Sequence, residues 1–299
     1  MSAATRGYPR VALVTCQELP DLDPDDRLLI EPLRARGIAV AVHAWDQEDA
    51  DWAGYDLVVL RSPWDYVPRR DEFLAWARTI PALANPAPVV EWNTDKRYLY
   101  RLATAGVPVV PTRWLAPDEP PWAAPSHGEY VVKPAISAGS LSTGRYDLAV
   151  PEQRRLAVRH ATRMQATGRV AMIQPYLSAV DTYGETALLY LGGRYSHAIR
   201  KGAMLVGPAA HVEGLYQPEE IQAREPSPAE LALAEKVLAA VPGGTPLLYA
   251  RIDLIPGPDG APLLIELELT EPSLFLGYAP GAATRLAEAI VARLGALRS

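Results

Sequence analysis

Hydrophobic and polar residues alternate along the stretch 247–273, which a Pro/Gly-rich segment at 256–262 divides into two halves. A period of two predicts a β-strand in each half, with the polar side chains of both on one face and aliphatic side chains on the other. The short interruption predicts that the two strands are neighbours in a hairpin. The polar positions are Tyr249, Arg251, Asp253, Glu266, Glu268 and Thr270.

This predicted hairpin gathers three carboxylates, those of Asp253, Glu266 and Glu268, beside one arginine. Two carboxylates about 4 Å apart repel by about 4 kcal/mol at an effective dielectric near 20, and Arg251 alone cannot offset three. Oxygen ligands without His or Cys suit Mg²⁺, which in proteins also takes phosphate oxygens. The hairpin therefore predicts a metal–nucleotide site. The alternative is an ordinary solvated outer face of an antiparallel sheet.

The pattern at the start of the chain predicts a small parallel α/β layer, because near-continuous apolar strands follow a β-α-β-β order. Strands are expected at 10–15, 39–43, 56–60 and 89–92, and helices at 25–36 and 71–77. Open sheets of this kind bind ligands beyond the carboxyl ends of their strands. The residues after the third strand are therefore candidate substrate contacts, although the aromatic ones could equally fill a packing gap. They are Arg61, Trp64, Asp65 and Tyr66.

The remainder of the chain predicts a mixture of helices and strands. Helices are expected at 93–105, 152–167, 228–240 and 280–297, and strands at 107–114, 129–134, 171–177, 186–191 and 195–200. Gly192-Gly193 predicts a hairpin between the last two strands. The segment 202–227 has no clear periodicity and is long for a connector. It is a candidate lid over the site, and its conformation stays open.

Composition narrows the class of function. A length of 299 residues suffices for two domains, or for one domain divided around a cleft. The net charge of −6 argues against nucleic acid as the main partner. The sequence has no long apolar run and no signal-peptide pattern, so we expect a cytoplasmic protein without a membrane partner. Its single cysteine excludes a cysteine-based zinc cluster. The oligomeric state stays open, a homo-oligomer included.

Lysine is rare in this chain, because only four of the 29 basic residues are lysines. Lys236 falls in a predicted amphipathic helix and is expected to be solvated. Lys96, Lys133 and Lys201 fall at the ends of predicted elements, with Lys96 in the first turn of the helix 93–105, where it opposes the helix dipole. The lysine ammonium is a compact point charge suited to phosphate. These three lysines are therefore candidate phosphate contacts.

The segment that follows Lys133, AISAGSLSTGR at 135–145, is rich in Gly, Ser and Thr. Small residues and free backbone N–H groups allow such a loop to close over phosphates. The segment matches neither the P-loop pattern nor the Rossmann glycine pattern, and a flexible connector has the same composition.

The order of these parts, from about Tyr8 onward, resembles the ATP-grasp ligases. The shared parts are a small α/β domain, a lysine near a helix start, a strand lysine before a Gly/Ser loop, a QPYL hinge, a strand ending in Arg-Lys and paired acidic strands. The motifs RSPWDY, WNTDKRYL, QPYLSAVDTYGE and ELELTEPS are most similar to the O-ureido-D-serine cyclo-ligases, which close the D-cycloserine ring. The resemblance implies an N-terminal parallel α/β domain at 1–92 and two α+β subdomains, at 93–175 and 176–299, that clasp ATP.

The resemblance also implies a role for each matching position. The ATP phosphates would be contacted by Lys96 and Lys133. The loop 137–144 would cover them through Ser137, Ala138, Gly139 and Ser140. The adenine would lie against Gln174, Pro175, Tyr176 and Leu177, with Asp181 or Glu185 at the ribose. The catalytic residues would be Arg251, which would steady the transferred phosphoryl group or the acyl oxyanion, and Arg200 and Lys201 at the γ-phosphate. Two Mg²⁺ ions would be held by Asp253, Glu266 and Glu268. The substrate would contact Arg61, Trp64, Asp65, Tyr66, Arg251, Glu271 and Ser273.

One departure is that many relatives end the acidic motif as Glu-x-Asn, whereas this chain has Glu268 there. Which acid is the main Mg²⁺ ligand therefore stays open.

The implied activity is an ATP-dependent cyclo-ligase of antibiotic biosynthesis. It would activate the carboxylate of O-ureido-D-serine as an acyl phosphate and release D-cycloserine, ADP, phosphate, CO₂ and ammonia. Two alternatives stay open: a ligase that joins an amino acid to a separate amine, and a non-catalytic ATP-binding regulatory module. The identity and stereochemistry of the substrate do not follow from the residues alone.

Overall fold

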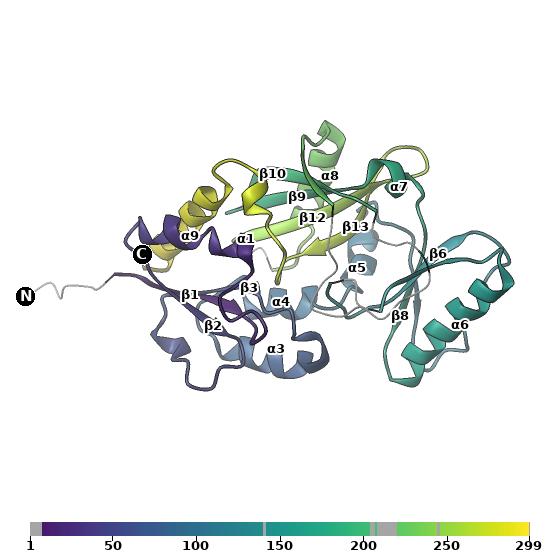
Figure 1. The fold of residues 1–299 in the computed structure, drawn as a ribbon, viewed down its shortest axis with the longest axis horizontal. Helices are drawn as coiled ribbons and strands as arrows, with labels where there is room; N and C mark the ends of the chain where they lie inside the picture. Colours follow the sequence, from purple (N-terminus) through teal and green to yellow (C-terminus); the bar gives the residue numbers. More distant parts are fainter. Residues whose placement is uncertain (1–7, 140–141, 204–206, 208–219, 244–245, 299) are drawn as a thin grey trace, which may run out of the picture.

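Three β-sheets organise the chain (Figure 1). The computed structural model describes residues 8–139, 142–203, 207, 220–243 and 246–298. None of the helices in these ranges is long and apolar enough to cross a membrane.

The first sheet is parallel, in the order β2-β1-β3-β4. Its strands are β1 (Arg10–Thr15), β2 (Ala39–Ala44), β3 (Leu57–Ser62) and β4 (Leu83–Ala84). Helices α1 (Pro24–Arg27) and α2 (Ile30–Arg34) lie on one side of it in the chain's main core, and α3 (Arg70–Thr79) and α4 (Ala87–Asn93) lie on the other. Short 3₁₀ turns η1 (Trp52–Gly54) and η2 (Val67–Arg69) complete this layer. The predicted parallel α/β layer is confirmed.

Several predicted elements near this sheet were wrong in detail. Residues 89–92 belong to α4 and not to a strand, since a short apolar run is ambiguous and Pro88 suits a first helical turn. The helix predicted at 25–36 is two short helices. The helix predicted at 93–105 is only α5 (Tyr98–Thr104). Lys96 therefore lies in the turn between α4 and α5, and the expected conflict with a helix dipole does not arise.

The second sheet is antiparallel, in the order β5-β8-β6-β7, and α6 (Pro151–Ala166) covers it on the far right of Figure 1. Its strands are β5 (Arg113–Leu115), β6 (Glu129–Pro134), β7 (Gly144–Asp147) and β8 (Ala171–Pro175). The strand predicted at 107–114 is thus much shorter, and before it Val109 forms only an isolated bridge with Leu264.

The third sheet is antiparallel, in the order β11-β10-β9-β12-β13. Its strands are β9 (Glu185–Leu191), β10 (Arg194–Lys201), β11 (Ile221–Arg224), β12 (Tyr249–Pro256) and β13 (Pro262–Glu268). Around it lie α7 (Ala179–Tyr183), α8 (Pro228–Ala239), η3 (Leu276–Tyr278) and α9 (Ala282–Arg298). The predicted acidic hairpin is confirmed as β12 and β13. Of the predicted lid at 202–227, residues 204–206 and 208–219 lie outside the described residues.

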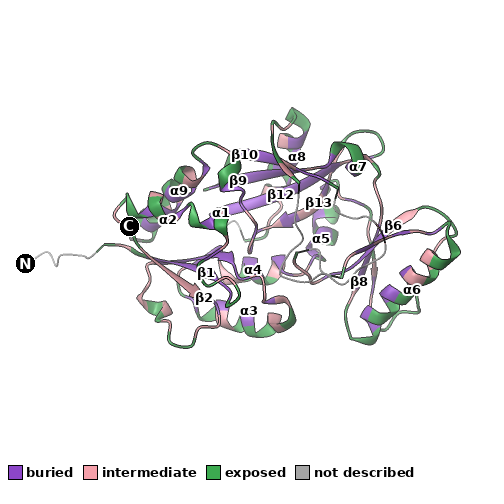
Figure 2. Cartoon of the chain, in the orientation of Figure 1, coloured by how far each residue is buried: buried purple, intermediate pink, exposed green. Residues whose placement is uncertain are grey.

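The first and third sheets share one hydrophobic core. Side chains of β1 and β3 pack in the same cluster as those of β9 and α9, and the strands β1, β3, β9 and β12 are largely buried (Figure 2). The second sheet has a separate core with α6. The three sheets fall within the three predicted segments, whose boundaries at 92 and 175 stay a prediction.

Buried amide side chains connect the acidic hairpin to the N-terminal layer. Asn85, after β4, accepts from the Leu248 N–H at 2.7 Å and donates to the carbonyls of Tyr249 and Leu269 at 3.0 and 2.8 Å. Asn93, at the end of α4, donates to the Leu267 carbonyl at 2.8 Å and accepts from the Leu269 N–H at 2.7 Å. These bonds fix the position of the hairpin that carries the acidic side chains.

We expect Asn85→Ala to lower the free energy of unfolding by about 3–5 kcal/mol, because it leaves three buried backbone groups without partners. Chemical denaturation measures the change, with Gln17→Ala, at an exposed side chain, as the control. A loss below about 1 kcal/mol would show that Asn85 does not anchor the hairpin.

Candidate active site

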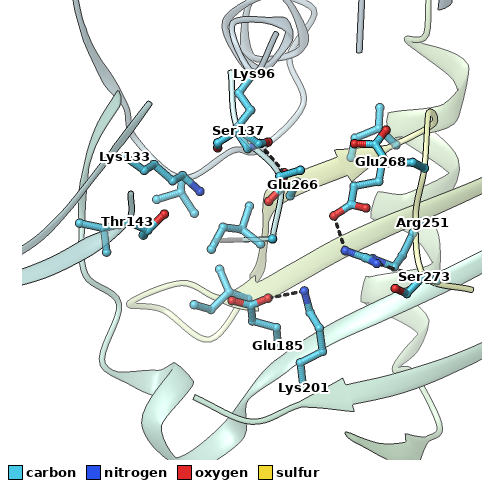
Figure 3. A pocket seen from close by; sticks show the side chains of 18 of the residues that line it. Lys96, Lys133, Ser137, Thr143, Glu185, Lys201, Arg251, Glu266, Glu268 and Ser273 are labelled. Carbon is cyan, nitrogen blue, oxygen red and sulfur yellow. Dashed lines mark hydrogen bonds and ion pairs between the residues drawn. The ribbon is translucent and has the colours of Figure 1, made fainter. Parts of the chain in front are cut away.

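A cavity of about 400 Å³ opens where the three sheets meet, and side chains from all three predicted segments line it. Four basic and six acidic side chains share this space, and those labelled in Figure 3 point toward a common centre. The basic side chains are Lys96, Lys133, Lys201 and Arg251. The acidic side chains are Asp23, Asp25, Glu185, Glu266, Glu268 and Glu271.

Two of the three cavity lysines are paired with carboxylates. The Lys96 ammonium lies 3.0 Å from Glu266 and donates to the Ser137 carbonyl at 2.6 Å, so it joins the acidic hairpin to the Gly/Ser loop. The Lys201 ammonium lies 2.6 Å from Asp253 and 2.9 Å from Glu185. These ion pairs hold both lysines at the cavity wall with their charge largely compensated.

Lys133, at the end of β6, differs from the other two. It is 9% exposed, and its ammonium has no hydrogen-bond or ion-pair partner among the residues that the structure describes. Burial lowers the pKa of Lys133, and the positive charge of Lys96 adds to this effect. A buried cation without a partner favours an anionic ligand such as phosphate.

The loop after Lys133 reaches the cavity through Ser137, Ala138 and Gly139. Ser140 lies outside the described residues. Thr143, at the other end of the loop, also lines the cavity, and the predicted site did not include it. The signal for Thr143 was its place in the Gly/Ser/Thr-rich segment.

The register of the acidic hairpin decides which carboxylates reach the cavity. Arg251 lies opposite Glu268, and Asp253 opposite Glu266. Arg251 forms ion pairs with both Glu268 and Asp253. Asp253 is 1% exposed and lies outside the cavity lining, because Arg251 and Lys201 occupy its two oxygens. Glu266 and Glu268 are the hairpin acids that face the cavity.

The two cavity-facing hairpin acids differ in their ease of ionisation. Burial opposes ionisation of Glu266, but the charges of Lys96 and Lys133 outweigh it and lower its pKa to about 2. Burial raises the pKa of Glu268 to about 8; Arg251 opposes this shift, and the neighbouring Glu266 and Asp253 add to it. An additional cation near Glu268 would therefore favour its ionised form.

The donor set fits Mg²⁺ in the form that nucleotide sites use. No group of three metal-ligating side chains is assembled within the described ranges, so the chain does not form a complete metal cage by itself. Mg²⁺ usually takes one or two carboxylates and completes its octahedron with phosphate oxygens and water. Glu266 and Glu268 supply those carboxylates, whereas Asp253 is already engaged by basic groups.

Strand alternation separates the two basic residues at the end of β10. Lys201 points into the cavity, whereas Arg200 donates to the carbonyls of Tyr183 at 2.8 Å and Thr182 at 3.2 Å, at the end of α7. Successive side chains of a strand point to opposite faces. The prediction that Arg200 reaches the γ-phosphate end was therefore wrong.

Variants of Lys201 and Arg200 allow a matched comparison, because the two residues are neighbours on β10 but point to opposite faces. We expect Lys201→Ala to lower kcat/KM by about 10²–10³-fold, since it removes a positive group aimed at the reacting charge, and Arg200→Ala to change it by less than about threefold. Steady-state ADP release measures both. Equal losses in the two variants would contradict the assignment of Lys201.

An apolar slot forms part of the cavity lining, and the residues predicted to contact adenine lie there. Gln174, Pro175, Tyr176 and Leu177 all line it. The aliphatic side chains that complete the slot were absent from the prediction, because apolar strand residues that line a pocket look like core residues in the sequence. They are Val110, Val131, Val180, Ile255 and Ile265.

The two candidates for a ribose contact are separated by the structure. Glu185 lines the cavity. Asp181 lies outside the lining and accepts from Tyr176 at 2.5 Å and from Arg145 at 3.2 Å. Arg145 also lies over the Tyr176 ring and pairs with Glu129. Asp181 thus links α7 to the second sheet, and Glu185 is the remaining candidate.

The RSPWDY segment after β3 contributes only its aromatic side chains to the cavity. Trp64 and Tyr66 line it, whereas Arg61 and Asp65 do not. Arg61 is fully buried and pairs with Asp26 at 3.0 Å. Asp65 accepts from the Trp45 indole at 2.7 Å. The direct substrate contacts predicted for Arg61 and Asp65 were therefore wrong.

The segment after β13 closes the last side of the cavity. Glu271 and Ser273, which were predicted to contact the substrate, line it. Phe275 and Tyr278 line it as well, and no pattern in the sequence singled them out. Phe275 has a left-handed backbone with φ of 50°, which turns the chain there toward η3.

Comparison with known proteins identifies relatives of this chain. Residues 11–87 match the family model for the N-terminal domain of the D-cycloserine synthetase DcsG. Over 300 aligned residues, the chain is 39% identical to the cycloserine biosynthesis protein DcsG of Streptomyces lavendulae, covering 95% of this chain and 98% of that protein. The chain belongs to the DcsG family.

Solved structures agree with this membership. The crystal structure of D-cycloserine synthetase DcsG matches with a TM-score of 0.85 and 39% identity, over 95% of this chain and 99% of that one. D-alanine–D-alanine ligase from Bacillus anthracis complexed with ATP matches with a TM-score of 0.61 and 16% identity, over 97% and 98% of the chains. The predicted ATP-grasp fold and the predicted family of ATP-grasp ligases are therefore confirmed.

Proposed function

We propose that this member of the DcsG family is an ATP-dependent cyclo-ligase that converts O-ureido-D-serine to D-cycloserine. The observation that carries the proposal is the convergence of three lysines and Arg251 on one cavity that also has an apolar slot. Positive charge at one end suits the ATP phosphates and a substrate carboxylate, and the slot suits adenine. The relatives, a cycloserine biosynthesis protein and a D-cycloserine synthetase, supply the product, and the resemblance to the cyclo-ligases supplies the substrate.

The first step joins the two anionic reactants. The substrate carboxylate attacks the γ-phosphorus of ATP, which forms an acyl phosphate and releases ADP. Lys96, Lys133 and Lys201 hold the phosphates, and Arg251 holds the carboxylate and balances the charge on the transferred group. Groups of this kind act by positioning the reactants and by stabilising charge in the transition state. Bound at Glu266 and Glu268, Mg²⁺ would supply further positive charge for the phosphates.

The second step closes the ring. The ureido nitrogen next to oxygen attacks the acyl carbon of the same molecule, loses its proton and displaces phosphate. Hydrolysis then removes the carbamoyl group, so that O-ureido-D-serine, ATP and water give D-cycloserine, CO₂, ammonia, ADP and phosphate. Because the nucleophile is part of the substrate, intramolecular attack replaces a second amine site. Trp64, Tyr66 and Phe275 supply apolar walls that limit access of water to the acyl phosphate.

A substrate panel tests the proposal. ADP release is measured with Mg²⁺-ATP and O-ureido-D-serine, its L-isomer, or D-alanine with and without added amines, and products are identified by mass spectrometry. We expect ADP and D-cycloserine in equal amounts from O-ureido-D-serine alone. Turnover only with a second amine would indicate an intermolecular ligase instead. ATP binding without ADP release from any substrate would indicate a non-catalytic module.

A further inference from the structure

Glu271 is the one cavity-lining glutamate without a basic partner in the described part of the chain. Glu185 pairs with Lys201, Glu266 with Lys96 and Glu268 with Arg251. Glu271 forms no ion pair there, and its carboxylate accepts a hydrogen bond from the Tyr66 hydroxyl. This arrangement holds a carboxylate in place but gives it no ion-pair partner among the described residues.

The backbone around Glu271 is fixed by three side chains that donate to consecutive carbonyls. The Trp64 indole donates to Glu271 at 3.0 Å, Arg61 to Pro272 at 2.6 Å and Arg251 to Ser273 at 3.2 Å. The fully buried Arg61, which does not reach the cavity, therefore helps to hold the segment that does. With the backbone so fixed, the Glu271 side chain is kept at the cavity wall beside Tyr66.

The surroundings of the Glu271 carboxylate favour a cationic ligand. Burial raises the pKa of Glu271 to about 7, although the Tyr66 hydrogen bond and the charge of Lys96 act in the opposite direction. A partly buried carboxylate without an ion-pair partner is costly, and a bound cation would recover that cost. The ligand that fills this part of the cavity should therefore carry a positive group.

The position of Glu271 relative to Arg251 indicates which positive group this is. Arg251 bonds the carbonyl of Ser273, two residues after Glu271, so one short segment brings an arginine and an unpaired carboxylate together. In an α-amino acid, the carboxylate and the ammonium group are attached to the same carbon. A substrate whose carboxylate lies at Arg251 thus presents its ammonium group to the same region of the wall.

We propose that Glu271, positioned by Tyr66, binds the α-ammonium group of the amino-acid substrate and thereby selects α-amino acids over carboxylic acids that lack the amine. This inference rests on the proposed function, since it assumes that the substrate carboxylate is activated beside Arg251. It assigns to Glu271 substrate selection, a task separate from the binding of Mg²⁺ at Glu266 and Glu268.

The experiment compares two substrates in two proteins. One substrate is O-ureido-D-serine, and the other is 3-(ureidooxy)propanoic acid, which has the same reacting groups but no α-amine. We expect the wild type to prefer the amine-bearing substrate in kcat/KM by about 100-fold or more, because a site built around a polar group rejects an analogue that lacks it. In Glu271→Gln the preference should fall to below about tenfold, chiefly through loss on the amine-bearing substrate.

Further variants separate this role from general damage. Tyr66→Phe should reduce the preference in the same direction but less, and Glu288→Gln, at an exposed glutamate, should leave it unchanged. The KM for ATP and the Mg²⁺ concentration for half-maximal rate should stay within about twofold in Glu271→Gln. Equal losses on both substrates, or a raised Mg²⁺ requirement, would overturn the assignment. An inactive wild type would refute the proposed function itself.

Discussion

Replacing Glu266 with glutamine is expected to lower kcat for ADP release by roughly 10³-fold or more at saturating ATP and substrate. The variant removes one of the two carboxylates available to Mg²⁺ and leaves the Lys96 ammonium without its partner at 3.0 Å. Loss of a metal ligand removes charge stabilisation in the transition state, and the freed lysine can move from its place beside Ser137. Steady-state kinetics, with Mg²⁺ titrated at each ATP concentration, measures both effects.

A matched control and a pH series complete this test. Glu235→Gln, on the exposed face of α8, should behave as wild type. The pKa of Glu266 is lowered on folding to about 2, so ionised Glu266 stabilises the fold above its usual pKa, and this contribution is lost as pH falls. The stability difference between wild type and Glu266→Gln should therefore be largest above about pH 5 and should narrow toward pH 3. A variant that keeps more than about a tenth of the activity would exclude Glu266 as a metal ligand.

The second large effect is expected at Lys133. Lys133→Met should lower kcat/KM for ATP by about 10²–10³-fold, because it removes the one cavity lysine, among the described residues, that forms no ion pair with a protein carboxylate. The same variant should be as stable as the wild type or more stable. Burial lowers the pKa of Lys133, so its charged form is costly in the fold without a ligand, and methionine removes that cost.

Opposite changes in activity and stability distinguish this role from a structural one. Nucleotide binding by calorimetry and thermal unfolding without ligand are measured on the same samples. Lys236→Met, at an exposed lysine on α8, should alter neither quantity. A Lys133→Met protein that binds ATP normally would show that the phosphates lie elsewhere. A large loss of stability would show that Lys133 has an internal partner.

Much of the site could be predicted because it lies on strands. A period of two assigns each strand residue to a face by local geometry alone, so the alternation around Arg251 and Glu266 was enough to predict a shared face. The hairpin turn then brought the two strands into register. The same rule separates Arg200 from Lys201, which the family pattern had placed together.

Short apolar and loop segments were harder to predict. Residues 89–92 have no periodicity long enough to distinguish a buried helix from a strand, and the structure shows part of α4. Arg61 and Asp65 follow a strand at the edge where ligands bind, yet they turn toward Asp26 and Trp45. Those partners are distant in the sequence, so the direction of each side chain depends on packing that no local pattern contains.

The sequence by itself determined the family, the ATP-grasp order of elements and the strand residues that carry the charges of the site. The tertiary structure decided how those charges are paired. It showed that Asp253 is enclosed by Arg251 and Lys201, and that Lys133 and Glu271 form no ion pair within the described residues. Pairing depends on distances of a few ångströms between segments far apart in the chain, because Coulomb energies fall with separation and with access of water. Local pattern carries no information on such distances.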